Sequence, residues 1–174
     1  MSQDLLFNKV DIFSIIQNHT STVNKRIESI PANTILNASE HDLTQYLIEE
    51  FRLNVPVIEE SEIYIAHSGE APVDVRYDPM RLILDHSRPF YVPGTETVIA
   101  VPFVGDAGFF RIQPQTYSLN PPRGEIKGNE ILLAYVRTDN NAEALKQEYQ
   151  RAVKSIQDAL RSLRRGRLRS RCFS

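Results

Sequence analysis

Apolar residues recur at helical spacing over residues 5–30, at Leu6, Val10, Phe13, Ile16, Val23, Ile27 and Ile30. This period predicts an amphipathic helix. A polar stretch at 18–22 leaves open whether there is one long helix or two short ones. Pro31 predicts the end of this region, because proline breaks the helical hydrogen-bond ladder and disfavours helical backbone at the preceding residue.

A second helix is predicted at about residues 40–53. Ser39 is a favourable N-cap with Asp42 three residues later, as in a capping box. The apolar stripe that follows consists of Leu43, Tyr46, Leu47, Phe51 and Leu53. This stripe predicts a helix with one buried face.

Residues 55–136 change to the pattern of strands and turns, with β-branched and aromatic residues punctuated by proline and glycine. Thr97, Ile99, Val101 and Phe103 alternate with their neighbours and predict one buried face of a strand. The predicted strands are residues 62–67, 71–77, 95–103, 109–113, 124–127 and 130–136.

The last two of these strands form a predicted hairpin. Gly128 and Asn129 supply a tight two-residue turn between them. Residues 131–136 are apolar on both faces, which is typical of a central strand.

A final long helix is predicted from residue 140, with Asn140 as N-cap and Glu143 three residues later. Its apolar residues follow a heptad-like spacing, at Leu145, Tyr149, Ala152, Ile156, Ala159 and Leu163. We therefore expect an α+β fold with N-terminal helices, a mixed, mostly antiparallel sheet and a long amphipathic C-terminal helix. The expected organisation is a core domain at 1–139, a helical arm at 140–165 and a basic, disordered tail at 166–174.

Composition places the chain among globular proteins, since 41% of its 174 residues are hydrophobic and 24% are charged. The sequence shows neither a membrane-spanning run nor a signal peptide, so a cytoplasmic location and no membrane partner are expected. The one cysteine, Cys172, has no second cysteine with which to form an internal disulfide or a thiolate zinc site.

Candidate catalytic residues are Asp106, Glu125 and Lys127. Two carboxylates and a lysine are the groups with which many nucleases hold a divalent ion and stabilise charge. The alternative interpretation is a solvated hairpin, because Gly128 turns the chain directly after Lys127. The four histidines lack metal-ligand spacing, and no glycine-rich phosphate loop opens a helix, so neither a metal nor another cofactor is predicted.

The arginine-rich end is the only dense cluster of like charge. All 22 acidic residues precede it, while six of the 20 basic residues lie within it, at Arg161, Arg164, Arg165, Arg167, Arg169 and Arg171. Such a cluster can bind phosphates without sequence preference. A solvated terminus is the other interpretation, because no aromatic side chain for base stacking is interleaved with the arginines.

Four turn-rich stretches resemble the amino-terminal region of a group of uncharacterised bacterial proteins: residues 73–79 (VDVRYDP), 88–95 (RPFYVPGT), 101–106 (VPFVGD) and 120–124 (NPPRG). In longer members of that group a helical arm leads to a restriction-endonuclease-like domain, a layout that is similar to a phage-defence effector. The resemblance covers about residues 40–160 and implies a recognition or scaffolding module, because the nuclease motifs have no matching positions here.

The sequence therefore predicts a non-catalytic binding or assembly module that docks or oligomerises with protein partners through its C-terminal helix. The alternatives are a metal-dependent nuclease or hydrolase built on Asp106, Glu125 and Lys127, and nucleic-acid binding through the arginine-rich end.

Overall fold

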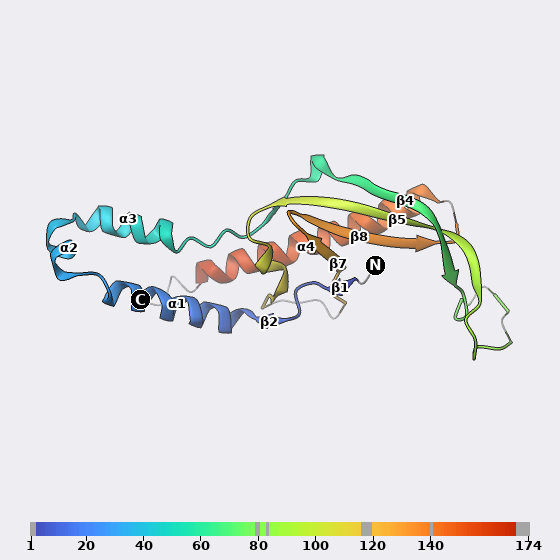
Figure 1. Cartoon of the computed structure of the whole chain (residues 1–174), viewed down its shortest axis with the longest axis horizontal. Coiled ribbons are helices and arrows are strands. Elements are labelled where there is room, and N and C mark those ends of the chain that lie inside the picture. Colours follow the sequence, from blue (N-terminus) through green and yellow to red (C-terminus); the bar gives the residue numbers. More distant parts are fainter. Residues whose placement is uncertain (1–2, 79–80, 83, 116–119, 140, 170–174) are drawn as a thin grey trace.

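The sheet is built around β5 (Tyr91–Val104), the longest strand in the computed structural model, which describes residues 3–78, 81–82, 84–115, 120–139 and 141–169 (Figure 1). The strand order is β1-β7-β8-β5-β3, and β4 also pairs with β5. All of these pairs are antiparallel, whereas the small β2–β6 pair is parallel. The predicted α+β class with a mostly antiparallel sheet is confirmed. The other strands are β1 (Asp4–Leu5), β2 (Val10–Asp11), β3 (Val57–Ile58), β4 (Tyr64–Asp74), β6 (Ile112–Gln113), β7 (Arg123–Lys127) and β8 (Glu130–Arg137).

The β7–β8 hairpin is the element that the sequence specifies most locally. Gly128 has a φ of 60°, the left-handed conformation that a tight hairpin turn requires and that glycine adopts without strain. β8 lies between β7 and β5, so its prediction as a central strand is confirmed. Its residues Ile131 and Leu133 are buried on one face and Leu132 on the other.

β4 and β5 form a long, bent pair of strands. Where two separate strands were expected, β4 is one strand with an irregular register between Ile65 and His67. A Cβ at Gly94 would lie 2.3 Å from Val73 Cγ2 and 2.6 Å from the Arg137 carbonyl oxygen, so only glycine permits this close crossing.

The N-terminal segment differs from its prediction. The helix α1 (Ile12–Glu28) is unbroken and starts at Asp11, whose side chain accepts hydrogen bonds from the Phe13 and Ser14 amides. The predicted helix over residues 5–11 is wrong, because Leu6 and Phe7 are buried in the main core and Phe7 has a φ of 59°. Phe7 is held there by its amide, which donates to the Phe110 carbonyl at 2.6 Å.

The segment expected to be a strand at 109–113 is also different. It begins as a 3-10 helix, η2 (Ala107–Arg111), and only Ile112–Gln113 form a strand. The 3-10 turn places Phe109 and Phe110 in the core together, which an alternating strand would not do. A second 3-10 turn, η1 (Glu60–Glu62), joins β3 to β4.

Two further helices follow α1. A short helix, α2 (Ala32–Asn37), occupies the region expected to be a loop. It leads to α3 (Glu40–Glu50), where Ser39 accepts a hydrogen bond from the Asp42 amide at 3.1 Å, as predicted. α3 ends before Phe51, so Leu53 lies beyond it. Figure 1 shows α1, α2 and α3 as a helical hairpin that extends away from the sheet.

The long helix α4 (Ala142–Arg169) lies along one face of the sheet (Figure 1). It shares one core with the strands, to which it contributes four buried side chains: Val153, Ile156, Leu160 and Leu163. α4 is therefore packed on the sheet within the chain, in contrast to a free arm, and its backbone continues past the expected end at residue 165.

The first turns of α4 are fixed to the end of β8. Asn141 Oδ1 accepts a hydrogen bond from the Ala144 amide, whereas the predicted cap, Asn140, lies outside the described residues. Arg137 forms ion pairs with Asp139 at 2.7 Å and Glu148 at 2.8 Å. Burial raises the pKa of Tyr135 to about 12, because removing water disfavours the phenolate, and the nearby Glu148 carboxylate acts in the same direction.

Candidate binding groove

The predicted catalytic residues do not share a site. Asp106 lines a hollow beside Arg52 and Arg164, whereas Glu125 lines a different one beside Asp4. Asp106 has a structural role, since its carboxylate accepts a hydrogen bond from the Gly108 amide at 2.8 Å and caps η2.

Lys127 lines neither hollow and is exposed at the end of β7, opposite Glu130 in the register. Within the described part of the chain, no group of three or more histidine, cysteine, aspartate or glutamate residues is arranged to hold a metal ion. Asp106, Glu125 and Lys127 therefore do not come together in one centre, as the nuclease interpretation requires.

The arginines at the end of α4 make different contacts. Arg164 Nη2 donates to the Pro56 carbonyl at 2.8 Å and thereby holds the segment before β3. Arg161 pairs with Asp158 at 3.2 Å on the same helix, and Arg165 is exposed. The side chains of Arg167 and Arg169, and all of Arg171, lie outside the described residues. Nucleic-acid binding through this end stays a prediction.

The heptad-like seam of α4 faces the chain's own sheet. Ile156 has no exposed surface and Leu163 is 3% exposed. The other four predicted seam residues are partly buried against the same core: Leu145, Tyr149, Ala152 and Ala159. Ile156 and Leu163 cannot contact a second chain while α4 stays on the sheet.

An apolar groove lies between α1 and α3. Its volume is about 500 Å³. The side chains that line it from the two helices include Ile16, Val23, Ile27, Leu47 and Ile48, while Phe109, Ile112 and Leu163 of the main core close its inner end. The groove is thus an open continuation of the protein's hydrophobic core.

The groove exists because the main core covers only the beginning of α1. Ile12 is buried, and Ile15 and Ile16 pack against the core. Further along, Ile27 of α1 is 45% exposed and Ile48 of α3 is 44% exposed. The amphipathic stripes of both helices therefore remain partly uncovered, an arrangement that marks interaction surfaces on soluble proteins.

Side-chain contacts join α3 to α1. Arg26 Nε donates to Glu50 Oε1 at 3.1 Å, and the rings of His19 and Phe51 meet edge to face at a centroid distance of 6.0 Å. The hydrogen bond that Arg26 donates to the Glu50 carboxylate is the main cause that raises the pKa of Arg26. These contacts hold the two helices together without filling the space between them.

The helical hairpin that carries the groove has a net negative charge. Residues 12–50 carry five carboxylates and two cations, a net charge of −3. Arg26 and Glu50 pair with each other, whereas Glu28, Glu40, Asp42 and Glu49 form no ion pair with any other described residue. These carboxylates lie outside the groove itself, since no aspartate or glutamate is among the residues that line it.

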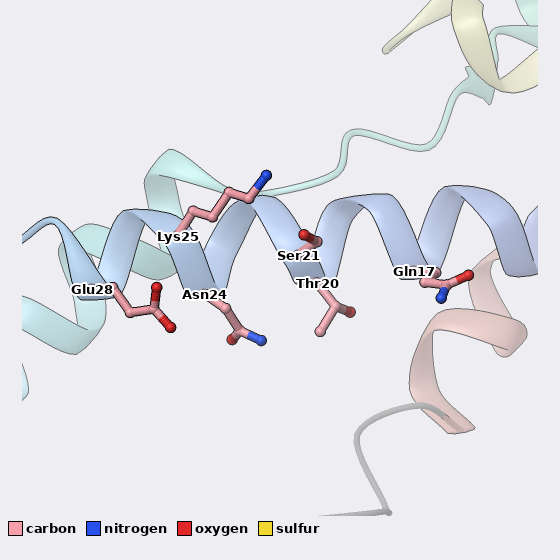
Figure 2. Close-up of a pocket in the computed structure, with 6 residues that line it drawn as sticks. All are labelled: Gln17, Thr20, Ser21, Asn24, Lys25 and Glu28. Atoms are coloured by element: carbon pink, nitrogen blue, oxygen red, sulfur yellow. The ribbon is translucent and has the colours of Figure 1, made fainter.

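The other side of α1 is polar. Figure 2 shows a shallow hollow along this side, lined by Gln17, Thr20, Ser21, Asn24, Lys25 and Glu28. None of these side chains is buried, and the strip includes both a cation and a carboxylate. It has no converging groups that would select a ligand, and we interpret it as the solvated face of an amphipathic helix.

Sequence reasoning found most of the groove's apolar residues but missed the groove. Ile16, Val23 and Ile27 were predicted to share one helical stripe, and Leu47 and Phe51 another. The two stripes face each other across a gap because of the direction in which the chain returns after α2. The sequence carries no local signal for that direction.

The described part of the chain contains no helix that is both long enough and apolar enough to cross a bilayer. Comparison with protein-family models, curated proteins and solved structures finds no match. The resemblance to the bacterial proteins described above therefore stays a prediction. The groove is the feature of the structure that bears on function.

Proposed function

We propose that this protein is a non-catalytic binding module that holds an apolar segment of a protein partner in the groove between α1 and α3. The observation that carries the proposal is an apolar groove of about 500 Å³ that lies open between two helices, which are joined by the ion pair of Arg26 and Glu50.

The chemistry of the groove favours binding over catalysis. Its volume falls within the range of about 300–1,000 Å³ found for ligand sites. His19, Thr20 and Thr44 are the only polar residues among the sixteen that line it. A groove of this composition offers shape and apolar contact, which is how helices and apolar loops are bound by helical partners.

The C-terminal helix α4 contributes to the inner end of the groove. Leu163 lies in its floor, and Arg164 holds Pro56 close by. Docking thus involves α4 in its packed position, and the helix does not have to leave the sheet.

Binding of the neutral dye Nile red tests whether the groove is open to apolar ligands. A neutral dye is chosen because residues 12–50 carry a net negative charge. We expect the wild-type protein to raise the emission of the dye, and Val23→Asp to abolish most of this increase, since Val23 lines the groove and a charge there opposes apolar binding.

Ser21→Asp is the matched control, because it places the same charge on the polar side of α1. It should leave the dye emission at the wild-type level. Equal emission from both variants, measured on samples with matching far-ultraviolet circular dichroism, would show that the dye binds elsewhere and would contradict the proposal.

A further inference from the structure

A second hollow lies at the end of the sheet where β3 pairs with β5. Its volume is about 760 Å³. Arg52, Asp106 and Arg164 are the charged residues among the nine that line it. None of these three residues lines the groove between α1 and α3. The hollow therefore has its own chemistry, with two cations and one carboxylate in its wall.

The segment that leads from α3 to β3 brings these charged residues together. Arg52 belongs to this segment. The Asp106 amide donates a hydrogen bond to the Asn54 carbonyl at 2.9 Å, and Arg164 Nη2 donates to the Pro56 carbonyl at 2.8 Å. Asp106 and Arg164 are thus anchored to carbonyls two residues apart, although they come from distant parts of the chain.

Each of the three charged side chains keeps hydrogen-bonding groups for a bound molecule. Arg52 is exposed and forms no ion pair within the described part of the chain. Arg164 uses Nη2 for its carbonyl contacts, which leaves Nε and Nη1 outside them. Asp106 caps η2 through Oδ1, so that its second oxygen is not needed for the cap.

Beside the charges the hollow has an apolar wall. Val57 and Val104 line it and lie opposite each other in the β3–β5 register. Val57 is 53% exposed and Val104 is 58% exposed. The two valines together offer a surface that a small apolar side chain of a ligand can cover, which removes apolar area from water.

We propose that this hollow binds a free α-amino acid with an apolar side chain. Arg52 and Arg164 hold the carboxylate of the ligand, because guanidinium groups match carboxylate oxygens in both charge and geometry. Asp106 holds its ammonium group, and Val57 and Val104 contact its side chain. This site goes beyond the proposed function, since it is separate from the groove that would hold a protein segment.

The balance of charge favours an amino acid over a phosphate-rich ligand. Two arginines and Asp106 give the hollow a net charge of +1, which suits a zwitterion. A polyphosphate or a nucleic-acid backbone brings several negative charges, which Asp106 opposes. Among the described residues that line the hollow none is aromatic, so it offers no surface on which a base could stack.

Titration of the isotope-labelled protein with L-leucine, followed by NMR, tests the proposal. A ligand of this size in an open hollow binds weakly, so a Kd on the order of a millimolar is expected. We expect the amide resonances of residues 52–57 and 104–106 to shift. Arg52→Gln should weaken the binding of leucine about fivefold, because one charged partner of the carboxylate is lost.

Asp106→Asn separates the ammonium contact from the structural role of Asp106, since asparagine can also cap η2. This variant should bind leucine about fivefold more weakly than the wild type does. It should bind 4-methylpentanoate, which lacks the ammonium group, at least as tightly as the wild type does. Equal leucine affinity of Asp106→Asn and the wild type would overturn the proposal.

Arg165→Gln is the matched control for Arg52→Gln, because Arg165 is exposed on α4 and does not line the hollow. It should bind leucine like the wild type. Equal weakening in both variants would show that diffuse charge attracts the ligand and would overturn the site. Resonances that do not move with leucine up to about 20 mM, or tighter binding of inorganic pyrophosphate than of leucine, would overturn it as well.

Discussion

Ile156→Asp is expected to destabilise the folded protein by more than about 4 kcal/mol, because it buries a carboxylate without a partner. Ile156 has no exposed surface and lies between α4 and the sheet, among side chains such as Val101 and Leu133. An aspartate there must either remain charged in an apolar core or take up a proton, and both outcomes oppose folding. Urea unfolding followed by circular dichroism measures the loss.

Gln150→Asp is the control for this substitution, because Gln150 is an exposed, uncharged residue of the same helix. Its free energy of unfolding should change by about 0.5 kcal/mol or less. If Ile156→Asp were as stable as Gln150→Asp, α4 would not be packed on the sheet as described. Because Ile156→Asp acts on folding, it cannot serve as a specific probe of assembly.

Phe110→Ala is expected to cost about 3–5 kcal/mol, the range for truncating a buried aromatic side chain. Phe110 is 1% exposed and meets the rings of Phe103 at 4.7 Å and Phe7 at 5.7 Å. Its loss leaves a cavity below the N-terminal segment. Phe7 in that segment has a positive φ, so its backbone conformation depends on tertiary packing. Thermal unfolding should therefore show a large decrease in Tm.

Phe13→Ala removes the same side chain from a position that is 59% exposed. This control should lower the free energy of unfolding by less than about 1 kcal/mol. Similar losses for Phe110→Ala and Phe13→Ala would contradict the assignment of Phe110 to the centre of the core.

Local signals in the sequence predicted the elements whose causes are local. Ser39 caps α3 through an amide three residues away, and Gly128 supplies the conformation that its turn needs. β8 lies between two other strands. A strand that is buried on both faces carries apolar residues at successive positions, which is the pattern that the sequence of β8 shows.

Several of the elements that sequence reasoning missed are decided by distant residues. Leu6 continues the helical spacing of α1, yet its amide bonds to the Pro122 carbonyl, and the Phe7 amide bonds to the Phe110 carbonyl. Those partners lie far along the chain and outweigh the local helical preference. Likewise, the seam around Ile156 has the same spacing whether it packs on another helix or on a sheet, so the pattern alone left the partner open.

The groove between α1 and α3 is another feature that the sequence pattern did not predict. Val23 and Ile48 each lie on a predicted amphipathic helix, and such helices normally cover their apolar faces with each other. Here Arg26 and Glu50 pair across the two helices, and an apolar space lies open between them. No spacing of residues in either helix reveals that space.

Amide hydrogen exchange with and without the neutral dye Nile red tests most directly whether the groove between α1 and α3 binds apolar ligands. We predict slower exchange in α1 and α3 of the wild-type protein when the dye is added, with β5 and β8 unchanged, and no slowing in Ile48→Asp, because Ile48 lines the groove. Exchange in α1 and α3 that stays the same at saturating dye, or that slows equally in Ile48→Asp, would contradict apolar binding in the groove.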